Sequence, residues 1–290
     1  MPIQTLTTKQ IEKIDNDKQF RIELARQSFY HFIGIYFNHI FSLKFAPKHE
    51  EIINTLDNLD DLYKYISVIG FRGCSKSTLA EIFATWSLVN DRHNFIVYIG
   101  NTIDNAKMSL ANIKNEIEQN ELLRSDFNIV LENQRHKFTD KWTESQVTVR
   151  DATIVAKSRG QKIRGAKFKQ ARIDLIIGDD LEEVKDAETT EKRKKTRKWF
   201  FGEVIPATKQ GVLSDEVKVV LIGNRVHRDC LIVRFSKSDI VKHIDFPIID
   251  EQGEPTWKSM FPNKEAIERE KEKEMIEGEG LGSIIWAREY

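Results

Sequence analysis

The stretch VIGFRGCSKSTLAEI, residues 68–82, decides the fold. It is close to the phosphate-binding loop pattern, in which a glycine and four further residues precede Gly-Lys-Ser/Thr. Gly70 begins the pattern, Lys76 and Ser77 end it, and Ser75 stands where the second glycine is usual. That position favours small residues and unusual backbone angles, so serine is a modest cost there. The stretch therefore predicts a nucleotide site with one variant residue.

The residues on both sides of this loop favour the strand and the helix that such a site requires. Residues 65–70 form an apolar, β-branched run, and residues 77–89 have a helical pattern. Backbone N–H groups and the helix amino end would then face an anion. Lys76 is predicted to reach the β- and γ-phosphates of ATP, and the Ser77 hydroxyl to hold Mg²⁺. The other loop residues predicted to bind the nucleotide are Gly73, Cys74, Ser75 and Thr78.

A second apolar strand ends in acidic residues. The stretch IDLIIGDDLEE, residues 173–183, places Asp179 at the carboxyl end of a strand, where α/β proteins bind ligands. We expect Asp179 to bind Mg²⁺ and a nearby carboxylate to polarise the attacking water. Glu182 is the favoured water-polarising residue, with Asp180 as the alternative and Glu183 as a competitor. A capped helix start is the structural alternative for the cluster.

A third apolar strand also ends in a polar residue. In VVLIGNRVHRDCLI, residues 219–232, the strand runs to Gly223, and Asn224 is placed to sense the γ-phosphate. His227 follows, but a lone histidine at such a position is more often structural than catalytic.

Composition limits the remaining possibilities. The 290 residues include 45 Lys and Arg and 45 Asp and Glu, so DNA contacts would have to come from local patches. Two cysteines cannot form a disulfide framework or a four-ligand metal site. The N-terminus lacks a signal-peptide core, and no run of about 18 apolar residues could span a membrane. A cytosolic protein is expected.

The rest of the chain alternates strand and helix patterns, which predicts a three-layer α/β fold with a mostly parallel sheet. Further expected strands lie at 95–100 and 217–223, with a hairpin at 146–158; helices are expected near 29–40, 48–59, 105–120 and 264–277.

These elements together resemble the ATPase domain of the large terminase subunit, the motor that packages DNA into tailed-virus capsids. The resemblance runs from about residue 45 to the end. In that family an arginine stands four residues before the loop lysine, as Arg72 does here, and Arg-Gly-x-(Ala/Ser)-Lys-Ser-Thr loops are common. FAPKHEEII resembles the adenine-recognition segment, with His49 in place of its glutamine.

Three further segments resemble the same family. SRGQKIRGAKFKQARIDLIIGDDLEE is the most specific, and FIVYIGNTIDNAKMS resembles the second strand and its helix. VLIGNRVHRDCLI resembles the coupling motif, although Gly-Thr is more frequent in the family than Gly-Asn.

The resemblance implies a P-loop NTPase of RecA/ASCE type. It divides the chain into a helical lead or lid (1–45), an ATPase core (46–250) and a closing segment (251–290). A nuclease domain follows in the family, so we expect it to have been cut from this chain or to be encoded separately.

The implied function is ATP hydrolysis, with Mg²⁺, that drives double-stranded DNA into a viral procapsid. Implied partners are the DNA, the portal protein, the small terminase subunit and other copies of the chain in a ring, in the host cytoplasm. An arginine would then complete a neighbour's ATP site. Arg172 is favoured because its distance from the acidic motif resembles that of the family, and Arg164 is the alternative.

The sequence is also compatible with two other functions, and one charged segment has two possible roles. A helicase would share these motifs but needs a second RecA-like domain, for which too few residues follow Gly223. A nucleotide-binding switch without hydrolysis is the other alternative. The run EKRKKTRKWFFGEV, residues 191–204, either contacts DNA phosphates or an acidic neighbour, or is a solvated helix face.

Overall fold

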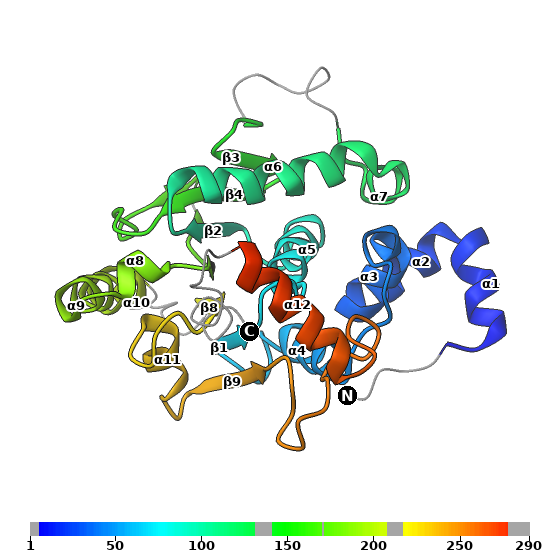
Figure 1. The fold of residues 1–290 in the computed structure, drawn as a ribbon. Coiled ribbons are helices and arrows are strands. Elements are labelled where there is room, and N and C mark those ends of the chain that lie inside the picture. The colour runs from blue at the N-terminus through cyan, green and yellow to red at the C-terminus, as the bar shows by residue number, and fades with distance from the viewer. Residues whose placement is uncertain (1–5, 131–140, 170, 208–216, 278–290) are drawn as a thin grey trace.

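A seven-stranded sheet runs through the computed structural model, which describes residues 6–130, 141–169, 171–207 and 217–277 (Figure 1). The strand order is β3-β4-β2-β7-β8-β1-β9, and all neighbours are parallel except β3 and β4. The strands are β1 Tyr65–Gly70, β2 Phe95–Gly100, β3 Gln146–Val149, β4 Ala152–Ser158, β7 Leu175–Asp179, β8 Lys218–Gly223 and β9 Val241–Phe246. A separate small pair joins β5 Lys167–Phe168 to β6 Ala171–Arg172.

Side chains of the central strands alternate between two buried layers. On β1, Ile66 and Val68 belong to one apolar cluster, whereas Tyr65 and Ile69 belong to the other. Both faces of the strand are therefore covered, which explains why its sequence is an almost continuous apolar run.

Helices cover both faces of the sheet, so the predicted three-layer, mostly parallel α/β fold is confirmed. Figure 1 shows α3, α4 and α5 on one side and α9, α10 and α11 on the other. The first side carries α3 Phe29–Tyr36, α4 Pro47–Asp57, α5 Lys76–Val89, α6 Ile103–Gln119 and α7 Glu121–Phe127. The second carries α9 Thr190–Trp199, a π-helical turn Phe200–Val204, α10 Ile205–Ala207 and α11 Leu231–Ser236. The other helices of the described residues are α1 Thr8–Asn16, α2 Lys18–Gln27, η1 Asn38–Ile40, α8 Val184–Ala187 and α12 Lys264–Glu277.

The N-terminal helices pack on the same core as the sheet. Trp86 of α5 donates its indole N–H to the carbonyl oxygen of Ala25 at 2.8 Å. Arg21 pairs with the buried Asp126 of α7, with 2.6 Å between Nε and Oδ2, and the Tyr36 hydroxyl donates to the same carboxylate at 2.8 Å. The domain boundaries expected at residues 45 and 250 stay a prediction. Among the described helices, none is both long and apolar enough to cross a membrane.

Candidate active site

The predicted site residues meet at the carboxyl edge of the sheet. β8 lies between β1, which leads into the loop, and β7, which carries the acidic pair. Because the carboxyl ends of parallel strands share one edge, the loop and both polar strand ends border one cleft of about 730 Å³. Eight candidate residues line it: Arg72, Gly73, Lys76, Ser77, Asp180, Glu182, Glu183 and Asn224.

The backbone of the loop explains its small residues. Gly73 has φ +83°, and Ser75 has φ 60° and ψ 14°, so both adopt left-handed conformations. The unusual backbone angle expected at the serine position is therefore present. At Gly70, an added Cβ would lie 2.6 Å from the Sγ of Cys74, so only glycine lets the chain turn this closely.

Replacing Ser75 by glycine is expected to stabilise the protein. The left-handed conformation costs a non-glycine residue about 1–2 kcal/mol, and the greater freedom of an unfolded glycine offsets about half of that. We expect the urea-unfolding free energy to rise by about 0.5–1 kcal/mol. Ser125→Gly, at an exposed right-handed position in α7, is the matched control and should lower it. A similar decrease of the unfolding free energy in both variants would show that the backbone of Ser75 is not strained.

Lys76 is a buried cation. It is the first residue of α5 and only 6% exposed, and it forms no salt bridge with any described residue. An unpaired ammonium in a buried place is costly, so the position favours an anion in the cleft. The amino end of the 14-residue helix α5 adds to the same preference.

Ser77 and Asp179 form the predicted metal-binding pair. The Ser77 hydroxyl donates to Oδ1 of Asp179 at 3.0 Å, across the gap between α5 and β7. A hydroxyl and a carboxylate oxygen suit Mg²⁺, which usually takes one or two carboxylates together with phosphate and water oxygens. The donor set therefore fits the expected ion.

Tyr98 holds the other oxygen of this carboxylate and was not anticipated from the sequence. Its hydroxyl donates to Oδ2 of Asp179 at 3.0 Å from the fully buried interior of β2. Burial and the neighbouring Asp180 raise the pKa of Asp179 to about 7. The hydrogen bonds from Ser77 and Tyr98 and the charge of Lys76 oppose this rise. Tyr98 is hidden in an apolar run, so only the sheet register could reveal it.

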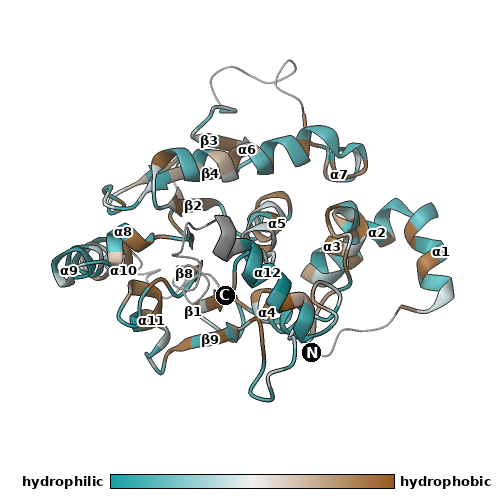
Figure 2. Cartoon of the chain, in the orientation of Figure 1, coloured by the Kyte–Doolittle hydropathy of each residue, from teal (hydrophilic) through white to brown (hydrophobic). Residues whose placement is uncertain are grey.

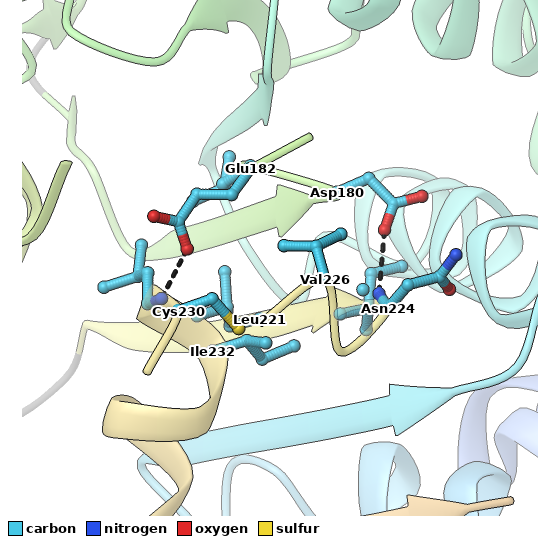
Figure 3. A pocket seen from close by; sticks show the side chains of 11 residues that line it. Asp180, Glu182, Leu221, Asn224, Val226, Cys230 and Ile232 are labelled. Carbon is cyan, nitrogen blue, oxygen red and sulfur yellow. Dashed lines mark hydrogen bonds between the residues drawn. The ribbon is translucent and has the colours of Figure 1, made fainter. Parts of the chain in front are cut away.

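The two candidate water-polarising carboxylates point in different directions (Figure 3). Asp180, in a left-handed conformation with φ 41°, accepts from the backbone N–H of Asn224 at 3.0 Å. Glu182 turns towards α11 instead, where its Oε2 accepts a short hydrogen bond from the backbone N–H of Leu231. Its Oε1 is buried and has no partner among the described residues, and burial raises the pKa of the side chain. Both nevertheless border the cleft.

His49 lies beneath the loop and not in the cleft. Its side chain is fully buried: Nδ1 accepts from the backbone N–H of Ala46, and Nε2 lies 3.1 Å from the carbonyl oxygen of Cys74. Burial lowers the pKa of His49 to about 4, so it is neutral at pH 7. In this position His49 supports the loop, and an adenine contact through its side chain would require it to move. Cys74 is buried and Thr78 continues α5, and neither borders the cleft.

Arg172 lies outside the seven-stranded sheet, close in sequence to the amino end of β7 and not to the carboxyl end that borders the cleft. It belongs to β6, just before the amino end of β7, whereas Asp179 ends that strand. Arg164 is exposed in the preceding loop. Neither lines the cleft of its own chain, so a catalytic role for either depends on a neighbouring copy. The structure adds Asn105, Lys185 and Glu188 to the cleft wall.

The sheet order, the loop after β1 and the acidic pair after β7 define a P-loop NTPase fold. No family model and no curated protein matches the sequence. Among solved structures, the chain is similar to a mutant large terminase ATPase domain from Thermus phage P74-26, at 13% identity and TM-score 0.48, over 85% of this chain and 93% of that chain. It is also similar to the DEAD-box helicase Mss116 bound to ssRNA and UDP-BeF, at 11% identity and TM-score 0.46, over 88% of this chain and 48% of that chain.

Proposed function

We propose that the chain is an ATP-hydrolysing motor domain of the large terminase type, which moves double-stranded DNA. The observation that carries the ATPase part is the buried Lys76, which lines one cleft together with Ser77, whose hydroxyl donates to Asp179. The candidate carboxylates Asp180 and Glu182 line the same cleft. A cation for phosphate, oxygen ligands for Mg²⁺ and a carboxylate for water are the three parts that phosphoryl transfer to water requires.

The residues divide this work by position. Lys76 and Arg72, which line the cleft, would bind the β- and γ-phosphates, and Asn224, just after the end of β8, would approach the γ-phosphate. Ser77 and Asp179 would hold Mg²⁺, which when bound would neutralise charge on the phosphate oxygens. Glu182 or Asp180 orients and deprotonates the attacking water. Tyr98 keeps the Asp179 carboxylate in place.

The DNA-packaging part of the proposal rests on the sequence motifs. The partners would be double-stranded DNA, the portal protein, the small terminase subunit and further copies of the chain in a ring. In such a ring the exposed Arg172 of one copy, or Arg164, would approach the nucleotide of the next. The proposed site of action is the host cytoplasm.

A nucleotide-dependent switch without hydrolysis is the second candidate, because Glu182 is bonded to α11 and not directed towards Asp180. An ATPase assay on the full chain separates the two functions. We expect Mg²⁺-dependent release of phosphate from ATP that rises when linear duplex DNA is added. Nucleotide binding without turnover, with or without DNA, would favour the switch and contradict the motor. Stimulation by single-stranded and not by duplex nucleic acid would instead favour a helicase.

A further inference from the structure

Two positively charged segments lie on the α9 side of the sheet. Residues 159–169 contain five Lys or Arg and no acidic residue, and α9 contains six Lys or Arg and one acidic residue. The whole chain has no net charge, so this concentration is a local feature. Figure 2 shows α9 as almost entirely hydrophilic.

The two segments form one surface, which we call the α9 surface. The Trp199 indole N–H donates to the carbonyl oxygen of Gln161 at 2.8 Å, and Arg159 Nη1 donates to Thr196 Oγ1 at 3.3 Å. Between them lies a groove of about 440 Å³, whose lining includes Arg159, Lys195 and Trp199.

Some of these cations are engaged in holding the fold, and others are not. Arg193 and Arg197 both pair with Asp229, and Lys192 pairs with Glu188. Six exposed cations of the surface form no salt bridge with any described residue; they are Lys162, Arg164, Lys167, Lys194, Lys195 and Lys198. These six side chains are therefore accessible to solvent and to a binding partner.

We propose that the α9 surface binds the phosphate backbone of duplex DNA, an assignment that rests on the motor function proposed above. Clustered Lys and Arg with few acidic residues are the electrostatic signature of phosphate binding. Lysine is depleted in the cores of protein–protein interfaces, so its density here argues against an acidic protein partner. Duplex phosphates recur along both strands and can meet several of these cations together.

The α9 surface is also connected to the nucleotide cleft through α8. Arg159 donates to Oδ1 of Asp186 at 2.6 Å, and Oδ2 of Asp186 accepts from the backbone N–H of Glu183 at 3.1 Å. Glu183 and Lys185 line the cleft, whereas Arg159 and Asp186 line the groove. A DNA phosphate that competes for Arg159 would weaken the hydrogen bond between Arg159 and Asp186. Asp186 would then hold Glu183 less firmly, and with it the segment that carries Glu182. DNA bound on one side of α8 can in this way alter turnover on the other.

The test is charge reversal at two unpaired lysines. Lys195→Glu/Lys198→Glu should lower the affinity of the full chain for a labelled duplex at least tenfold. It should also flatten the slope of log affinity against log salt, by about 0.9 for each DNA phosphate that is no longer neutralised. Lys9→Glu/Lys237→Glu, at two exposed lysines outside the surface that form no salt bridge with described residues, is the matched control with the same change in charge. Phosphate release without DNA should be unchanged in both double variants, and DNA stimulation should disappear only in the first.

The outcomes separate this surface from the proposed function. Equal affinity and salt slope in the two double variants would overturn the assignment, even if ATP is hydrolysed. Displacement of the duplex by poly-glutamate at equal charge concentration would overturn the preference for nucleic acid. Selective loss of duplex binding in a chain that hydrolyses no ATP would support the surface and contradict the motor.

Discussion

Replacing Lys76 by alanine is expected to lower the turnover of MgATP roughly 10²–10³-fold, the loss typical when one preorganised charge-stabilising group is removed. The ammonium is buried at the amino end of α5 and has no carboxylate partner in the described structure, so its charge is available to the phosphates. Steady-state phosphate release with and without DNA measures the effect. Lys237→Ala, at an exposed lysine far along the chain, should leave turnover unchanged.

Stability provides an independent check on Lys76. Lys76 is buried and forms no salt bridge with any described residue, so its removal relieves a desolvation penalty that no ion pair offsets. The melting temperature of Lys76→Ala without nucleotide should therefore stay the same or rise. ATP should stabilise the wild-type protein more than this variant. Unchanged turnover, or a lower melting temperature without nucleotide, would contradict the role given to Lys76.

The sequence predicted those parts of the fold that are buried on both faces. The runs at 65–70 and 95–100 became β1 and β2 at the same residues, because strands covered by helices on both sides are continuously apolar. The hairpin expected at 146–158 became β3 and β4, with Arg150 at φ 54° in its turn. The run at 173–178 became β7 at Leu175–Asp179, shifted by tertiary pairing with β2 and β8.

Edge elements were harder to predict. β9, with the sequence VKHIDF, was missed because only Ile244 and Phe246 of this edge strand are fully buried. The helix expected near 29–40 ends earlier: α3 stops at Tyr36, and a short 3-10 turn follows. In both segments, tertiary contacts decide the structure more than local pattern does.

The site shows the same limit. The positions of the loop and of Asp180 at strand ends were enough to predict that they border one cleft. The burial of His49 under Cys74 could not, because it depends on how α4 packs beneath the loop. Arg172 precedes β7 and Asp179 ends it, so the two residues lie near opposite ends of this strand. Their short separation in sequence does not show this.

The direction of Glu182 also depends on packing, since its partner Leu231 belongs to a separate helix. This geometry makes Glu182→Gln an informative substitution. The amide oxygen of the introduced glutamine can still accept from the Leu231 N–H, so α11 should keep its position. Glutamine cannot take a proton from water, so only the chemical step should be affected.

Glu182→Gln is therefore expected to bind ATP with near-native affinity and to hydrolyse it roughly 10²–10⁴-fold more slowly, the usual contribution of a general base. Equilibrium binding of a fluorescent ATP analogue and single-turnover phosphate release measure the two properties separately. Asp180→Asn is the matched comparison, because asparagine can still accept from the Asn224 N–H that Asp180 binds at 3.0 Å. If Asp180→Asn binds ATP but stops hydrolysis while Glu182→Gln remains active, Asp180 is the base and Glu182 serves only to cap α11. If both variants hydrolyse ATP at the wild-type rate, neither carboxylate polarises the water, and the catalytic assignment of this acidic cluster is wrong.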